Sequence, residues 1–225
     1  FEMLEQLKSS NFIFSGPGSP SYASKTWLHS EIPNVLTNHL KNGKNAVFSS
    51  AAASTLGEKT IPVYEIYKVG MTPFWEEGLN TLELYGLSCT VVPHFNNKEG
   101  GNHDTSCSYI GKNRLNMLID EEYTNILGID EHTALVINGE KEIFSVDGIG
   151  SVTVKTSNGQ TVFEAGNEYS LSELQSILQA TNKKELQPNK TSSDNIDVNS
   201  LKKEIAKLNL ELKNNNDFTT LFDKT

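Results

Sequence analysis

The sequence has little of several features that define common protein classes. Only two of its 225 residues are cysteines, and Cys89 and Cys107 show no CxxC spacing, so a disulfide scaffold is not indicated and a reducing compartment is expected. No apolar run approaches the roughly 18 residues of a membrane-spanning helix, and the N-terminus has no export-signal pattern. We therefore expect a cytoplasmic protein without a membrane partner.

Basic residues are also scarce. The chain has 19 Lys and Arg against 28 Asp and Glu, a formal net charge of -9. Without a basic surplus there is little to displace counterions from a phosphate backbone, so nucleic acid is not an expected partner. Arg114 is the only arginine. Since lysine occupies every other basic position, we expect Arg114 to make a two-point contact with a carboxylate of the protein or of a substrate.

Short apolar runs alternate with helical stretches over the first half of the chain. The expected strands are 11–14, 46–49, 63–69 and 87–92, and the expected helices are 20–40, divided at Pro33, and 75–85. Strands that alternate with helices favour a parallel sheet covered on both faces. The sequence therefore predicts an α/β fold, a three-layer sandwich around a mostly parallel sheet.

The pattern changes near Arg114. A helix at 113–120 is followed by strands at 125–129 and 133–137 and by turns at Asn138-Gly139, Asp147-Gly148 and Asn158-Gly159, which predict an antiparallel β-hairpin extension. A further helix is expected at 171–178. We assign residues 1–180 to this domain, 181–198 to a flexible linker, and 199–225 to an amphipathic helix that packs on a partner or an attached domain. The sequence is also compatible with a homodimer as a partner arrangement.

Ser50 stands between a short strand and a run of small residues. In that position a serine is exposed at the carboxyl end of its strand, with the following N–H groups available to a developing oxyanion, as in a nucleophile elbow. The two glycines of the usual elbow pattern are absent, because Phe48 and Ala52 occupy their positions. The alternative is an ordinary helix N-cap.

Two more residues extend this hypothesis. His94 follows the strand that ends at Pro93, and the carboxyl ends of parallel strands converge on one crevice. Glu65 is a carboxylate in an apolar, strand-like run, where a charge is usually paired. Glu65 paired with His94 would orient the ring, with Asp104 or Glu99 as substitutes. The alternatives are a structural histidine and a solvent-facing glutamate.

Four segments in this order resemble the cyanophycinase and peptidase E family of serine peptidases, whose fold is that of class I glutamine amidotransferases. They are the glycine-rich loop 14–19, the serine-alanine elbow 48–53, the histidine motif 93–95 and the strand region 128–135. The chain looks most similar to an uncharacterised branch that is sometimes labelled cysteinyl-tRNA synthetase-like, although it has no nucleotide-binding or zinc-ligand signature for aminoacylation.

The resemblance implies a serine hydrolase that cleaves a peptide or isopeptide-like amide. Ser50 would be the nucleophile, His94 the base and Glu65 the acid, with Ala51 and either Gly18 or Gly16 donating to the oxyanion. Ala52 in place of a glycine, Pro17 in the loop and the apparent lack of the family's first strands depart from the pattern. They leave a second reading open, a catalytically inactive binding or regulatory domain.

The loop from Asn96 to Cys107 is rich in groups that bind substrates. As substrate contacts we expect polar side chains in or near it, namely Asn96, Asn97, Asn102, Arg114 and Glu131. A solvated polar loop is the alternative. The potential metal ligands His94, His103, Asp104, Cys107 and His132 follow no ligand spacing, so we expect neither a metal nor another cofactor.

Overall fold

The computed structural model describes residues 2–185, so the helix expected at 199–225 and most of the linker lie outside the described residues. The helices are α1 Glu2–Ser9, α2 Pro20–Leu28, α3 Ile32–Lys41, α4 Ala51–Ser54, α5 Lys112–Glu121 and α6 Leu171–Glu185. The strands are β1 Phe12–Ser15, β2 Asn45–Phe48, β3 Lys59–Thr60, β4 Glu76–Glu77, β5 Thr90–Val92, β6 Ile126–Ile129, β7 Thr133–Asn138, β8 Ile143–Gly148, β9 Ser151–Thr156, β10 Gly159–Glu164 and β11 Asn167–Ser170. The first residues of the predicted linker, 181–185, belong to α6.

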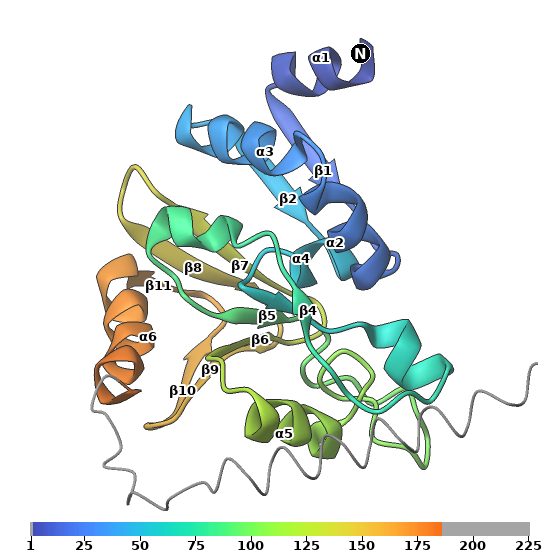
Figure 1. The fold of residues 1–225 in the computed structure, drawn as a ribbon. Coiled ribbons are helices and arrows are strands. Elements are labelled where there is room, and N and C mark those ends of the chain that lie inside the picture. The colour runs from blue at the N-terminus through green and yellow to red at the C-terminus, as the bar shows by residue number, and fades with distance from the viewer. Residues whose placement is uncertain (1, 186–225) are drawn as a thin grey trace, which may run out of the picture. The chain divides into compact units, whose positions relative to one another are not determined.

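The strands form several small sheets (Figure 1). β1 pairs with β2 in parallel, and a four-stranded sheet has the order β10-β9-β6-β5, in which β5 and β6 are parallel and the other pairs antiparallel. The sheets β11-β8-β7 and β3-β4 are antiparallel. The fold is therefore mixed α/β, and the single, mostly parallel sheet expected from the sequence does not form within residues 2–185.

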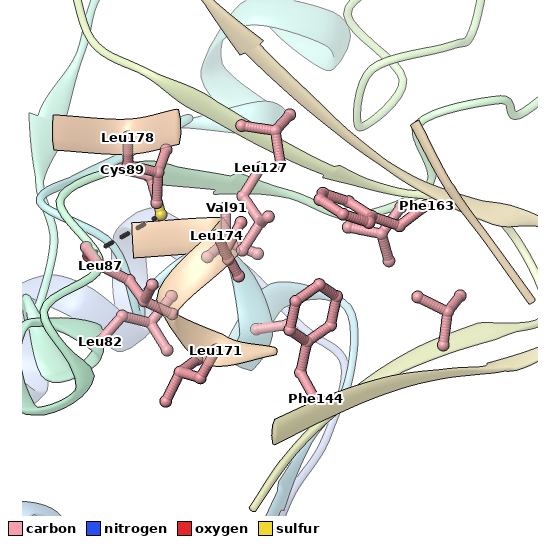
Figure 2. Packing of buried hydrophobic residues seen from close by; sticks show 14 residues of the cluster. Leu82, Leu87, Cys89, Val91, Leu127, Phe144, Phe163, Leu171, Leu174 and Leu178 are labelled. Carbon is pink, nitrogen blue, oxygen red and sulfur yellow. Dashed lines mark hydrogen bonds between the residues drawn. The ribbon is translucent and has the colours of Figure 1, made fainter. Parts of the chain in front are cut away.

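The main core lies between the four-stranded sheet, the β11-β8-β7 sheet and α6. Its members are almost fully buried apolar side chains from all three elements, including Val91, Leu127, Phe144, Phe163, Leu174 and Leu178 (Figure 2). The spacing of Leu171, Leu174, Ile177 and Leu178 predicts one apolar helix face; the three leucines are buried, and Ile177 is partly buried. This core fixes the ends of β5 and β6, after which His94 and Glu131 follow.

Three local predictions are corrected. Residues 64–68 form a π-helix rather than a strand. Alternation of apolar and polar residues over so short a run does not distinguish a strand from a helical turn. The helix expected at 75–85 is the short strand β4 followed by a 3₁₀ helix, Thr81–Tyr85, that ends at left-handed Gly86. Asp147 and Gly148 do not form a hairpin turn: they are the last residues of β8, paired with β7, and the chain then passes to β9 in the other sheet. None of the helices in residues 2–185 is long and apolar enough to cross a lipid bilayer.

Candidate active site

Ser50 lies in a strained turn between β2 and α4. The hydrogen bond from Ser49 N–H to the Ser15 carbonyl, at 2.8 Å, extends the β1–β2 pairing by one residue. The backbone then reverses at Ser50, which has φ 54° and ψ -114°, and α4 begins at Ala51. A serine with positive φ is costly, on the order of 1–3 kcal/mol, and Ser50 makes no side-chain cap bond to α4. Its side chain is thereby directed away from its own helix.

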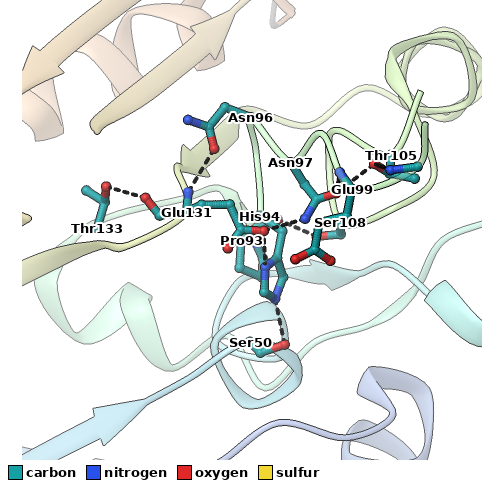
Figure 3. Close-up of polar contacts among 11 residues, drawn as sticks. Ser50, Pro93, His94, Asn96, Asn97, Glu99, Thr105, Ser108, Glu131 and Thr133 are labelled. Atoms are coloured by element: carbon teal, nitrogen blue, oxygen red, sulfur yellow. Dashed lines mark hydrogen bonds and ion pairs between the residues drawn. The ribbon is translucent and has the colours of Figure 1, made fainter. Parts of the chain in front are cut away.

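The Ser50 hydroxyl is hydrogen-bonded to His94. Ser50 Oγ lies 2.8 Å from His94 Nε2, and the other ring nitrogen, Nδ1, lies 2.9 Å from Glu131 Oε1 (Figure 3). His94 also has a positive φ, 54°, two residues beyond the end of β5. The Phe95 N–H donates to the Ile129 carbonyl at 3.0 Å, which keeps the chain after β5 beside the end of β6. The site thus contains a continuous serine–histidine–glutamate chain of contacts.

Glu131 reaches His94 because it occupies the equivalent place on the neighbouring strand. β5 and β6 are parallel, and Glu131 follows the end of β6 by two residues, as His94 follows β5. Partial burial raises the pKa of the Glu131 carboxyl, but the hydrogen bonds from Asn97 and His94 outweigh this effect, and the pKa lies below its usual range. Glu131 is therefore ionised at neutral pH.

Glu65 does not contact His94, contrary to the expectation from the sequence. Its Oε1 accepts a hydrogen bond from Ser21 Oγ at 2.6 Å, and both ring nitrogens of His94 have other partners. The π-helix places Glu65 against α2 instead of in a strand beside β5. Asp104 and Glu99, the substitutes considered, do not fill the role either: Asp104 accepts hydrogen bonds from the Ser106 and Lys112 N–H groups.

A cavity of about 550 Å³ opens beside Ser50 and His94. Gly18 and Ala51 line it, whereas Gly16 is not among its lining residues. The N–H groups of Gly18 and Ala51 donate to no acceptor within residues 2–185. Two of the three expected oxyanion donors therefore border the cavity with an uncommitted N–H.

The lining of the cavity is partly aromatic. It includes Tyr64, Tyr67 and Tyr109, and the ring of Tyr109 lies 5.1 Å from that of His94, centroid to centroid. Lys68 also lines the cavity, with its Nζ 4.1 Å from the Tyr64 ring centroid. No aspartate or glutamate of the described residues lines it.

The residues expected to contact a substrate lie elsewhere. Asn97 is 3% exposed and its side chain binds Glu131, and the exposed Asn96 accepts the Glu131 N–H at 2.9 Å. Asn102 is exposed and lines no part of the cavity. Arg114 donates to the Ile110 carbonyl at 3.2 Å and forms no ion pair with a carboxylate of the described residues, so the expected contact with a protein carboxylate is not found there, and the contact with a substrate carboxylate stays a prediction. Glu131 contacts His94 and is not among the residues that line the cavity.

The loop after His94 is held in an unusual backbone conformation. Cys107, Ser108 and Tyr109 have φ values of 54°, 56° and 69°, three consecutive left-handed residues without a glycine. Ser108 Oγ donates to the Pro93 carbonyl at 2.8 Å, which ties this turn to the residue before His94. Burial raises the pKa of the Cys107 thiol, as expected for an inert buried cysteine. Within the described part of the chain no group of three metal-ligating side chains is assembled.

Comparison with known proteins gives structural likeness only. No protein-family model matches the sequence, and no curated protein matches it significantly. Among solved structures, a peptidase from an acI-B1 Actinobacterium matches with a TM-score of 0.58 and 22% identity over 75% of this chain and 63% of that one. A candidate peptidase E protein from Listeria monocytogenes EGD-e matches with a TM-score of 0.46 and 17% identity over 66% of this chain and 65% of that one.

The fold of the described residues is thus a mixed α/β fold of a kind found in a peptidase. The chain spans less than two thirds of the length of the Actinobacterium peptidase. The site within this fold brings together Ser50 and His94 as the sequence suggested, and supplies Glu131 as the carboxylate at the histidine.

Proposed function

We propose that this chain is a serine hydrolase that cleaves a peptide or isopeptide-like amide, in the manner of the peptidase E and cyanophycinase family it resembles. The observation that carries the proposal is the hydrogen bond of 2.8 Å between Ser50 Oγ and His94 Nε2, made from a strained turn, with Glu131 on the far ring nitrogen. Nucleophile, base and orienting acid then stand in the order of a catalytic triad.

The chemistry follows from the protonation of these groups. Ser50 Oγ attacks the amide carbonyl carbon while His94 Nε2 takes the hydroxyl proton, and ionised Glu131 stabilises the imidazolium through Nδ1–H. The carbonyl oxygen becomes an oxyanion, and the proposed donors to it are the N–H groups of Gly18 and Ala51, which line the cavity and have no acceptor within residues 2–185. The C–N bond then breaks, and the amine leaves with the proton from Nε2.

Water completes the cycle. A water oxygen attacks the acyl carbon as His94 Nε2 takes one of its protons. The ester bond to Ser50 Oγ then breaks, and Oγ recovers that proton. The carboxylic acid product leaves, and the Ser50–His94 hydrogen bond reforms.

The cavity wall favours uncharged or acidic substrate groups near Lys68. Its lining holds one lysine and no carboxylate among the described residues, so a cationic group there would meet repulsion without compensation. A substrate with a basic group at this place is therefore disfavoured, and a short peptide or amide that packs against the tyrosines is preferred.

Labelling with a fluorophosphonate probe tests this proposal. The probe forms a covalent bond with activated serines, so the wild-type chain should be labelled on Ser50, as read by peptide mass mapping. Ser50→Ala should abolish labelling, whereas Ser49→Ala, a change in the adjacent serine, should leave it in place. Folded wild-type protein that resists the probe would instead favour the alternative, a binding or regulatory domain.

A further inference from the structure

The Asn97 side chain is buried and its hydrogen bonds fix which way the amide faces. Its Oδ1 accepts two donors, Thr105 Oγ1 at 2.6 Å and the Glu99 N–H at 3.1 Å. An amide nitrogen cannot accept a hydrogen bond from these donors, so the end of the Asn97 amide that faces them is the oxygen, and Nδ2 faces the other way. Nδ2 donates to Glu131 Oε1 at 2.6 Å (Figure 3).

Thr105 gives this arrangement a direction. Thr105 is 2% exposed, and its Oγ1 accepts the Gly100 N–H at 3.1 Å. Because that oxygen already accepts from a backbone donor, its own proton is free to go to Asn97 Oδ1. A single chain of donors therefore runs from Gly100 through Thr105 and Asn97 to the Glu131 carboxylate.

The end of this chain is the oxygen that also binds the histidine. Asn97 Nδ2 and His94 Nδ1 both contact Oε1 of Glu131, whose side chain is 28% exposed. A carboxylate this open to water could rotate away from the ring and be solvated, and the buried amide opposes that rotation. If the amide turned over, its oxygen would instead face the carboxylate and repel it.

We propose that Asn97 is a positioning residue that holds Glu131 against His94, and that Thr105 sets the orientation of the Asn97 amide. This inference rests on the proposed hydrolase function. It assigns Asn97 a role through Glu131 in place of the substrate contact expected from the sequence. It also makes Thr105, which contacts no member of the triad, a contributor to the reaction rate.

The test compares rates of fluorophosphonate labelling at saturating and subsaturating probe. Asn97→Ala should lower the maximal rate on the order of 10- to 100-fold, because a hydrogen bond to a charged group is lost. Thr105→Val keeps the shape of the side chain and removes its donor, and should lower the rate about fivefold. Thr105→Ser should restore the wild-type rate. The half-saturating probe concentration should not change in any of them.

Ser106→Ala is the matched control. Ser106 is the next residue, is 5% exposed, and uses its hydroxyl on Asp104 rather than on Asn97. It should label at the wild-type rate. Thermal unfolding of each variant shows that it is folded, and Thr105→Val carries the test if Asn97→Ala does not fold.

The outcomes separate the two proposals. Labelled wild type with slowed Asn97→Ala and Thr105→Val, and with normal Thr105→Ser and Ser106→Ala, supports the positioning role. Equal rates in all the variants would overturn it while leaving the hydrolase proposal intact. Slowing of Ser106→Ala to the same degree as Thr105→Val would also overturn it, since loop integrity would then explain both. Unlabelled wild type removes the proposed function, and this inference with it.

Discussion

The hairpin region, residues 133–180, and the turns that carry the site hold their shape in different ways. In the hairpin region, paired strands and α6 enclose side chains such as Phe144, Phe163 and Leu174, each 0–2% exposed. Around the site, the backbone has positive φ at Ser50 and His94 and from Cys107 to Tyr109, and hydrogen bonds hold the turns. Apolar packing stabilises the hairpin region over a wide area. The strained turns cost free energy, and they orient a few side chains.

This difference predicts that stability and reactivity can be separated by mutation. A cavity in the hairpin region should lower the free energy of unfolding and leave the site's geometry unchanged in the molecules that remain folded. A change in one of the turns around the site should alter the geometry of the site and have the smaller effect on the free energy of unfolding. The following variants test the comparison, from the largest expected effect to the smallest.

Phe144→Ala should be the most destabilising change. Phe144 is fully buried and packs against Phe163 and Tyr169, with ring centroids 5.0 and 5.2 Å away. Truncation should lower the free energy of unfolding by about 3–5 kcal/mol, measured by denaturant titration. Labelling of the folded fraction should stay within about twofold of wild type. A loss below about 1 kcal/mol would show that this region is not the main source of stability.

Gly128→Ala probes the border between the two regions. A Cβ on Gly128, in β6, would come within 2.6 Å of the Phe95 ring, so that ring must move, and Phe95 is bonded in sequence to His94. We expect about 1–3 kcal/mol of destabilisation and a slower labelling rate. Phe144→Ala serves as the control for stability alone. Normal labelling would mean that the His94 turn is independent of the packing of Phe95.

Asp104 links a turn of the site to pH. Hydrogen bonds from the Ser106 hydroxyl, the Lys112 N–H and the Ser106 N–H lower the pKa of Asp104. A lowered folded-state pKa contributes stability above the unfolded pKa, and this contribution is lost as pH falls through the folded pKa. Because Asp104 is largely exposed, solvent screens the effect. Loss of its hydrogen bonds in Asp104→Ala should lower the free energy of unfolding by about 1 kcal/mol at pH 7, and the difference from wild type should vanish in acid. A pH-independent difference in urea titrations would contradict this assignment.

Glu142→Gly should give the smallest change, and a stabilising one. Glu142 is exposed in the β7–β8 turn and has φ 54°. Glycine removes the cost of the left-handed conformation in the folded state, about 1–2 kcal/mol. It also raises the conformational entropy of the unfolded chain, which offsets part of this effect. We therefore expect the free energy of unfolding to rise by less than about 1 kcal/mol. Thermal unfolding measures it. A lower melting temperature would show that the Glu142 side chain is itself needed in the turn.

The sequence predicted the regular parts of the molecule better than the site's acid. The helix expected from residue 20 begins there as α2, the strands expected at 125–129 and 133–137 are β6 and β7, and the helix expected at 171–178 is part of α6. These features are local, so a single segment contains the information. The number of sheets was not predictable in this way, because it depends on which strands pair.

The acid was mistaken for a related reason. A charge in an apolar run needs a partner, which makes Glu65 a candidate for the acid, but its partner is Ser21 on α2. Glu131 carried a usable signal: it follows the strand parallel to β5, at the same distance from its end as His94. Recognising that signal required knowing that β5 and β6 are neighbours. The left-handed turn at Cys107–Tyr109 carried no signal, since none of its residues is glycine or asparagine.

The most direct measurement compares Glu131→Gln with Glu65→Gln by their rates of fluorophosphonate labelling at Ser50. Both changes replace a carboxylate by an amide of the same shape. If Glu131 orients His94 and stabilises its charged form, Glu131→Gln should slow labelling on the order of 10²- to 10⁴-fold. Glu65→Gln should stay within about threefold of wild type. A fast Glu131→Gln beside a slow Glu65→Gln would contradict the Ser50–His94–Glu131 assignment.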